Sequence, residues 1–330
     1  MILHKIKKQL IKRLNLSGML WPNLANGLYC FNFHRIGEQK ETCFDPCVFS
    51  CNESSFSQYL RFFKKNFHVV SLDEVIQLTK NNTPITEKLA LITFDDGYSD
   101  NYHLAYPLLK EQHLSAAFFI TTSLIGSNSV PWWDEIAWHV KQCEGKKIQL
   151  SLWDKAIEID KPVSNLDIRG VLQKIKASPK TVALQLEELR KISGAVIPEN
   201  ERHELFMTWP QLQEMIKNDM NISAHSHTHQ IFSVLSKQEL DFELSESKAL
   251  IENKLSTHVT SLSYPVGGSK TYNTTMYKAI EANGYDIAFS FQPFVNKHLL
   301  ENRFALGRFS IDQAFNERNL KEMILSANVI

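Results

Sequence analysis

The stretch LITFDDGYSDNY, residues 91–102, runs four mostly apolar residues directly into two adjacent carboxylates and a glycine. The apolar run, which begins at residue 88 as KLALITF, predicts a buried strand. Side chains alternate faces along a strand, so Asp95 and Asp96 at its end can point to different places while staying close in space. Two neighbouring acids can therefore take two different roles.

Short apolar runs alternate with longer amphipathic segments along most of the chain, which is typical of β–α units around a parallel sheet. Strands are expected at residues 27–34, 68–72, 88–94, 115–121, 220–226, 259–265, 286–291 and 304–311. Residues 127–207 interrupt this rhythm with helix-like segments, and the strand pattern resumes after them. We therefore expect an α/β barrel that carries a helical insertion on its rim, where the insertion could shape a substrate cleft.

Composition excludes few functions, but it limits the expected partners and the expected cellular compartment. The chain has 330 residues, and its 36 basic and 36 acidic side chains give no formal net charge, so no nucleic-acid partner is expected. The five cysteines lack paired disulfide spacing, and we interpret them as free thiols in a reducing compartment. Cys43, Cys47 and Cys51 stand at equal four-residue steps that do not match a zinc pattern, so we interpret them as incidental.

Residues 1–20, MILHKIKKQLIKRLNLSGML, have scattered lysines and no continuous apolar core, so they predict neither a cleavable signal nor a membrane span. On a helix, the apolar residues would share one side and most basic residues the other. Two interpretations are open: a terminal helix packed on its own domain, or peripheral contact with an anionic membrane surface. We expect a cytoplasmic protein, at the inner face of the membrane under the second interpretation, with one main domain over 21–330.

Reactive side chains gather at the expected carboxyl ends of the strands, where the loops of a barrel meet. His34 ends the first strand, and the fifth ends in a segment that contains His225, His227 and His229. His225 and His229 are four residues apart, so a helical turn at Ser226 would direct both imidazoles to one point. Two neutral imidazoles and one carboxylate form a three-ligand set that suits zinc or another divalent transition metal and leaves positions open for water and substrate.

Three motifs carry a family resemblance. TFDDG (93–97), HSHTH (225–229) and SYPVGG (263–268) resemble, in order and approximate separation, the successive motifs of the NodB-type polysaccharide deacetylases, carbohydrate esterase family 4. The resemblance runs from about FNFHRIG at residue 31 to RFALGRFSI at residue 303, apart from the insertion. It implies a distorted (β/α) barrel and a metal-dependent hydrolase that removes N-acetyl, or sometimes O-acetyl, groups from sugars.

The resemblance also implies roles for individual residues. Three would hold the metal, expected to be zinc with cobalt or nickel as alternatives: Asp96, His225 and His229. Asp95 would then be the catalytic base that takes a proton from water. The backbone N–H of Val266, which follows the proline of the third motif, would stabilise the oxyanion, and a backbone donor tolerates any residue there except proline.

Two positions depart from the family pattern. The arginine often found two residues before the proline of the third motif is replaced by Ser263. Arg308 is therefore the candidate to support Asp95, with Arg35 as an alternative. The late Leu-x-His motif, whose histidine protonates the leaving amine, has no clear counterpart. His34 is the candidate general acid, and a purely structural strand-end histidine is the alternative.

Aromatic residues near these motifs suggest substrate contacts. Trp132 and Trp133, in PWWDEIAWH, could stack against sugar rings or could instead anchor a helix to the core. Tyr264, in the third motif, is a further candidate for substrate binding. Asp134 follows the tryptophans and is interpreted as a solvated acid at a helix start.

The leading hypothesis is a cytoplasmic deacetylase acting on an N-acetylated sugar within a nucleotide-linked or lipid-linked glycan precursor, since a cytoplasmic enzyme would not meet a finished wall polymer. One alternative is a metal-dependent hydrolase of another non-peptide C–N bond, in a cyclic amide or a formamide. The other is a non-catalytic glycan-binding homologue. The complete metal set and Asp95 count against that last alternative, whereas Ser263 and the missing late histidine count for it.

Overall fold

The computed structural model describes residues 16–329, and its centre is an eight-stranded parallel sheet. The strands are β1 (Gly27–Phe33), β4 (His68–Val69), β5 (Lys88–Asp96), β6 (Ala117–Ile120), β9 (Asn221–Ala224), β10 (Ser261–Ser263), β11 (Ile287–Phe289) and β13 (Arg308–Ser310). Seven of them follow the order β11-β10-β9-β6-β5-β1-β13, and β4 pairs with the start of β5. Each strand overlaps one that the sequence predicts.

The two edges of the sheet meet through the segment that leads into β13. Leu306 pairs with Phe289 of β11, and two residues later Arg308 pairs with Cys30 of β1. The same short segment therefore touches both edges and nearly closes the sheet into a barrel. This arrangement confirms the expected α/β barrel fold.

Alternate residues of the strands face two different hydrophobic clusters. On β1 and β5, Leu28, Cys30, Leu89 and Leu91 belong to the cluster inside the barrel, whereas their neighbours pack against the surrounding helices. A strand that is buried on both faces has a continuous apolar run in its sequence, which explains why β1 and β5 could be predicted from their local sequence alone. All five cysteines are unpaired, as predicted.

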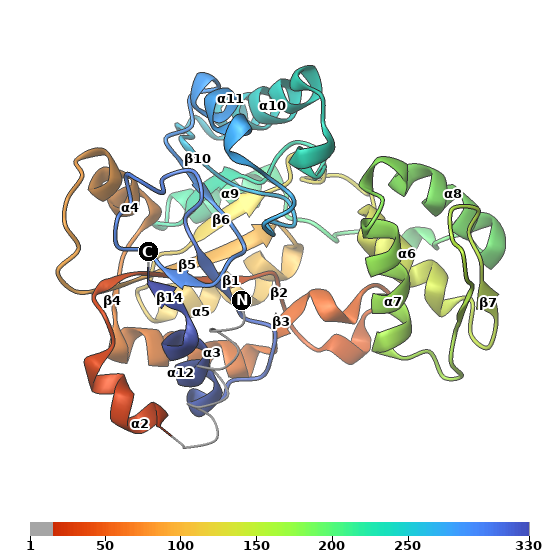
Figure 1. The fold of residues 1–330 in the computed structure, drawn as a ribbon, viewed down its shortest axis with the longest axis horizontal. Coiled ribbons are helices and arrows are strands. Elements are labelled where there is room, and N and C mark those ends of the chain that lie inside the picture. Colours follow the sequence, from red (N-terminus) through yellow and green to blue (C-terminus); the bar gives the residue numbers. More distant parts are fainter. Residues whose placement is uncertain (1–15, 330) are drawn as a thin grey trace.

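Helices cover the outside and one end of the barrel (Figure 1). They are α2 (Ser17–Leu20), α3 (Glu53–Asn66), α4 (Leu72–Lys80), α5 (Tyr106–Glu111), α9 (Trp209–Ile216), α10 (Lys237–Leu255), α11 (Tyr277–Ala282) and α12 (Glu317–Ser326). On α3, Phe56, Leu60 and Phe63 recur at helical spacing and form the buried stripe. Val75 of α4 packs with Leu28 in the inner cluster, so α4 covers the end where the strands begin. The opposite end stays open for a site.

Between β6 and β9 the chain forms a helical lobe that stands to one side of the barrel (Figure 1). It consists of α6 (Trp132–Lys141), the hairpin of β7 (Lys147–Ile148) and β8 (Ile157–Glu158), α7 (Asn165–Lys176) and α8 (Val182–Ser193). These elements share a hydrophobic cluster that includes Ile136, Val171 and Leu189. Tyr98 and Leu124, from loops of the barrel, join the same cluster, so the lobe is packed onto the open end of the barrel.

Most of the helix expected over residues 1–20 lies outside the described residues, and so does the membrane contact proposed for it. The described part begins with α2, of which only Ser17 is buried. Among residues 16–329, no helix combines the length and the apolar run needed to cross a bilayer.

Candidate active site

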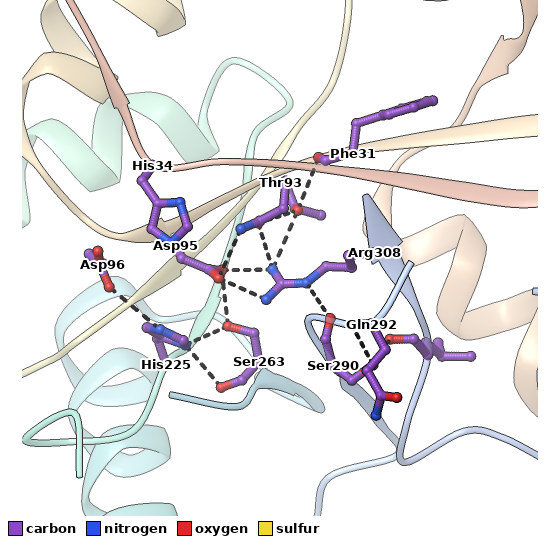
Figure 2. Close-up of polar contacts among 12 residues, drawn as sticks. Phe31, His34, Thr93, Asp95, Asp96, His225, Ser263, Ser290, Gln292 and Arg308 are labelled. Carbon is purple, nitrogen blue, oxygen red and sulfur yellow. Dashed lines mark hydrogen bonds and ion pairs between the residues drawn. The ribbon is translucent and has the colours of Figure 1, made fainter. Parts of the chain in front are cut away.

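Asp95 points into the open end of the barrel because it continues the inward-facing series of Leu91 and Thr93 on β5. The side chain is buried, and Arg308 donates to both of its oxygens, from Nη1 to Oδ1 at 2.8 Å and from Nη2 to Oδ2 at 2.7 Å (Figure 2). Ser263 Oγ donates to Oδ1 at 3.0 Å, and Asn32 Nδ2 donates to Oδ2 at 3.2 Å. Every one of these contacts favours the ionised carboxylate.

Electrostatics around Asp95 follow from these contacts. Burial on its own would raise the pKa of Asp95, but the Arg308 guanidinium and, next, His225 more than reverse that effect and hold the pKa well below its ordinary value. Arg308 is itself held in place, since its Nε donates to Ser290 O at 3.0 Å and its Nη1 to Asn32 Oδ1 at 2.7 Å. Asp95 is therefore a fixed anion at neutral pH.

Asp96 lies next to Asp95 but faces a different set of residues. Its backbone has a φ of +75°, in the left-handed region, and its carboxylate faces away from Arg308 toward His225 (Figure 2). Asp96 Oδ1 lies 3.5 Å from His225 Nε2 and 3.4 Å from His229 Nε2, and all three side chains are buried. One ligand atom from each of the three lies within 4.8 Å of the others. The expected ligand set is thus brought together in space.

The chemistry of these three side chains fits a divalent metal. Within residues 16–329, Asp96 Oδ1 is buried without a hydrogen-bond donor. Burial, and then the charge of Asp95, raise the pKa of Asp96 well above its ordinary value, whereas burial lowers the pKa of both His225 and His229. Two neutral imidazoles and a carboxylate that lacks a counter-charge are the donors a metal such as zinc requires.

His225 shows the outer hydrogen bond that is typical of a metal-ligating histidine. Its Nδ1 lies 3.0 Å from the carbonyl oxygen of Ser263, an acceptor that selects the tautomer with the proton on Nδ1. Nε2 is then left with a lone pair directed at Asp96. Because Ser263 Oγ also donates to Asp95, this one serine contacts both the candidate base and a candidate ligand.

The loop from His225 to His229 does not form the helical turn at Ser226 that would have been one way to direct both imidazoles to one point. Ser226 and His229 have φ values of +65° and +58°, in the left-handed region, and no helix forms. Glu243 of α10 stabilises the loop, since its Oε2 accepts from the backbone N–H groups of His227 and Thr228 at 2.9 and 2.8 Å. His227 contacts Thr122 Oγ1 instead of Asp96. The loop therefore presents alternate histidines to the site through tight bends.

Val266 is at the wall of the cleft, with a φ of +63°. No hydrogen bond of the described residues uses its backbone N–H. The next residue, Gly267, also has a positive φ, and a Cβ there would meet Phe291 Cβ at 2.8 Å. The tight backbone leaves the Val266 N–H available to a bound oxygen.

His34 lines the same cleft, and its ring centroid lies 5.7 Å from that of Phe291. Burial lowers the pKa of His34 to about 4, an effect that Asp95 opposes and Arg308 reinforces. The imidazole is therefore neutral at pH 7. Arg35, the alternative partner for Asp95, instead forms an ion pair with Asp100 at 2.8 Å.

The candidate substrate-binding aromatics take different positions. Tyr264 is buried, donates its hydroxyl to Phe304 O at 2.7 Å and stacks on Tyr272 with centroids 4.2 Å apart. Trp133 is also buried, and its ring centroid lies 4.3 Å from that of His229. Trp132 is half-buried and lies 6.5 Å from His229 by the same measure. Trp133 thus packs on a candidate metal ligand, and Trp132 is the more accessible ring.

Asp134 corrects the sequence interpretation, because it is fully buried and not a solvated helix-start acid. Its Oδ2 accepts from Tyr98 Oη at 2.7 Å, and its Oδ1 accepts from the Asp45 N–H at 3.1 Å. Tyr98 Oη in turn accepts from Trp133 Nε1 at 2.7 Å. Burial raises the pKa of Asp134 to about 6, against the lowering effect of Arg35. This network joins the lobe to the barrel beside His229, and the local sequence gives no sign of it.

A cleft of about 670 Å³ connects these groups. The candidate base and ligands lie on its barrel side, and residues of α7 form part of the opposite wall. The site therefore lies between the open end of the barrel and the lobe, where a loop-built active site is expected in a β/α barrel.

Comparison with known proteins identifies the fold and the family. Among solved structures, the Streptococcus pyogenes deacetylase PplD in complex with acetate aligns with a TM-score of 0.58 and 17% identity, covering 90% of this chain and 98% of PplD. IcaB from Ammonifex degensii aligns with a TM-score of 0.59 and 14% identity, covering 92% of this chain and 99% of IcaB. These similarities show a shared fold.

Sequence similarity extends this result. The chain is 25% identical over 218 residues to the Bacillus subtilis (strain 168) polysaccharide deacetylase homologue YxkH, an alignment that covers 66% of this chain and 50% of YxkH. It is also 25% identical over 91 residues to the poly-β-1,6-N-acetyl-D-glucosamine N-deacetylase of Escherichia coli (strain K12), covering 27% of this chain and 13% of that protein. The chain thus spans about half the length of YxkH and a smaller share of the Escherichia coli protein. The polysaccharide deacetylase family matches residues 82–288, well over half of the chain, and the protein therefore belongs to that family.

Proposed function

We propose that the protein is a metal-dependent hydrolase that removes the N-acetyl group from a sugar within a glycan or glycan precursor. The observation that carries the proposal is the buried set of Asp96, His225 and His229 next to an arginine-paired Asp95. Family membership and an N-deacetylase among the relatives support the same reaction. A cytoplasmic location, where unpaired cysteines are stable, belongs to this proposal as well.

Asp96, His225 and His229 would hold the metal, and the two-imidazole, one-carboxylate set suits zinc, with cobalt or nickel as alternatives. A divalent metal held there would supply Lewis acidity, which polarises the amide carbonyl and makes the attacking water more acidic. That acidification matters here because the Arg308 ion pair lowers the pKa of Asp95 and so makes it a weak base.

Asp95 takes one proton from the attacking water, whose oxygen bonds to the carbonyl carbon of the acetamide. Arg308, Ser263 and Asn32 fix the orientation of the carboxylate, so little reorganisation is needed when the proton is transferred. The electron pair of the carbonyl moves onto its oxygen, and the N–H of Val266 donates a hydrogen bond to this developing oxyanion.

Cleavage of the C–N bond needs a proton on the leaving nitrogen. His34 is neutral at pH 7, so it can act only as a relay for the proton that Asp95 has just received. We propose that His34 passes that proton to the amine, which leaves acetate and a free amino sugar as products. The substrate would lie in the cleft, which Trp133 and Tyr264 line, whereas Trp132 lines a neighbouring hollow and could contact only a sugar that extends beyond the cleft.

Acetate release from N-acetylated oligosaccharides, assayed with zinc or cobalt and with a chelator, tests the proposal. Metal-dependent release is the expected result. Release of formate or ammonia from other amides, with no acetate from any sugar, would identify a different C–N hydrolase. Tight glycan binding without any hydrolysis would identify a binding protein.

A further inference from the structure

One face of α7 is turned toward the active-site cleft. Asn165, Arg169 and Lys176 all line the cleft, and they are spaced by four and seven residues, which places them on the same side of a helix. Between them, Leu172 is buried in the hydrophobic cluster of the lobe. The inserted lobe therefore contributes two cationic side chains to the wall opposite the candidate metal ligands.

These two cations differ in their surroundings. Arg169 Nη2 forms an ion pair with Asp45 Oδ2 at 3.1 Å, and Asp45 is almost completely buried, so each charge has a partner. Lys176 has none: within residues 16–329, no carboxylate forms an ion pair with its Nζ. Its Nζ lies 5.3 Å from the ring centroid of Trp132, a contact that places the ammonium group near the rim of the metal site.

Lys176 is half-buried, and burial lowers its pKa, with a further lowering from the nearby Arg169. Asp45 and Asp96 oppose this effect but do not cancel it. The other acids of the cleft do not neutralise the positive charge of Lys176, because Asp95 is paired with Arg308 and Asp312 is exposed to solvent. A divalent metal would neutralise Asp96, so the cleft between the metal and α7 would carry a net positive charge.

An unpaired ammonium group beside a metal is unfavourable unless the substrate brings a negative charge. A lysine is well suited to bind one, because its compact charge binds a phosphate or a carboxylate without the fixed geometry of an arginine. We propose that Lys176 binds an anionic group, a phosphate or a carboxylate, on the sugar substrate, so that the enzyme selects anionic N-acetylated glycans over neutral ones. This inference deepens the proposed function and rests on it.

Binding of amino sugars, which lack the acetyl group and cannot be hydrolysed, tests the inference without turnover. Titration calorimetry on the zinc-loaded protein would compare glucosamine 1-phosphate, glucosaminuronic acid and methyl glucosaminide, which all carry the amino group and differ in the phosphate or carboxylate. The first two distinguish a phosphate from a carboxylate as the preferred anion. We expect about a tenfold preference for one of the two anion-bearing sugars over methyl glucosaminide, as a single charge-assisted hydrogen bond would give.

Three variants separate the role of Lys176 from general charge. Lys176→Gln should reduce the preference to less than about twofold, and Lys176→Arg should retain most of it. Lys174→Gln is the matched control on the same helix, because Lys174 Nζ donates to Lys155 O and lies over Trp153, away from the cleft. Circular dichroism would verify that all three fold. Equal affinity of the wild-type protein for the three sugars, or an anion preference that survives Lys176→Gln, would overturn the inference.

Acetate release from N-acetylglucosamine 1-phosphate, measured in parallel, keeps the two proposals apart. An anion preference that depends on Lys176 without any acetate release would contradict the deacetylase and leave the anion site standing. Acetate release at equal rates from anionic and neutral N-acetylated sugars, with no preference in binding, would support the deacetylase and overturn the anion site.

Discussion

Arg308, on the last strand of the barrel, donates hydrogen bonds to both carboxylate oxygens of Asp95, at 2.8 and 2.7 Å, and both side chains are buried. The two residues are 213 positions apart in sequence, and the near-closure of the sheet brings β13 beside β1 and so places Arg308 inside the barrel. In the family pattern, the corresponding arginine belongs to the third motif, where this chain has Ser263. The structure places a guanidinium beside Asp95 from a different strand.

Replacing Arg308 by methionine should destabilise the fold by about 3–5 kcal/mol, because it leaves the buried charge of Asp95 without its partner. Urea unfolding of Arg308→Met measures this loss. The double variant Arg308→Met with Asp95→Asn removes both charges and should recover part of the stability. If the two single effects simply added in the double variant, Arg308 and Asp95 would not be energetically coupled.

The buried carboxyl of Asp134 should make stability depend on pH in a defined window. Its folded-state pKa, about 6, lies above the unfolded value of about 3.9, so the folded protein binds more protons than the unfolded chain between these values. Its contribution is fully present below pH 4 and is lost as pH rises through about 6, a change of roughly 3 kcal/mol. Asp134→Asn cannot titrate, so the stability of the wild-type protein relative to this variant should fall between pH 4 and pH 7. A pH-independent difference in urea unfolding would contradict this.

Metal binding should stabilise the folded protein, because the ligand set comes from β5 and from the loop after β9 and is assembled only in the fold. At a metal concentration one hundred times the dissociation constant, the expected gain is about 2.7 kcal/mol. Thermal unfolding with zinc and with a chelator measures the shift. His229→Ala should abolish it, whereas His227→Ala, which removes a histidine that contacts Thr122, should not. An unchanged zinc response in His229→Ala would remove His229 from the ligand set.

Val266 has a left-handed backbone, which is unfavourable for a β-branched residue. Val266→Gly relieves the strain of the folded backbone but raises the conformational entropy of the unfolded chain, which opposes folding. We therefore expect a net gain in stability of about 1 kcal/mol or less. Because the N–H remains, acetate release should persist at a similar rate. Val266→Pro removes the N–H and also forces the backbone out of the left-handed region, so it should lower the stability and lower the rate by about 10²–10³-fold or more. Equal rates for the proline variant and the wild-type protein would exclude Val266 as the donor.

Much of the fold could be predicted from the sequence because its determinants are local. The apolar runs of β1 and β5 are buried on both faces, and the positions of Asp95 and Asp96 at the end of a strand follow directly from that pattern. The convergence of His225 and His229 with Asp96 could be expected because carboxyl ends of parallel strands meet at one end of a barrel.

Other features depend on contacts between distant segments. The choice between Arg308 and Arg35 is decided by sheet closure, which no local pattern encodes. Asp134 reads as a surface acid because acids are common at helix starts, yet Tyr98 from a barrel loop covers it. The left-handed bends of the His225–His229 loop, whose backbone donates hydrogen bonds to Glu243 of α10, bring the imidazoles together instead of the helical turn that the spacing alone would allow. Lys176 acquires its position only through the packing of the lobe on the barrel.

The different roles of the two adjacent carboxylates are the central claim of this account. The most direct measurement is the zinc content and the acetate release of Asp95→Asn and Asp96→Asn, side by side with the wild-type protein. We predict that Asp95→Asn retains zinc and loses acetate release by at least about 10²-fold, whereas Asp96→Asn loses both. Retention of zinc by Asp96→Asn, or wild-type turnover by a zinc-loaded Asp95→Asn, would contradict it.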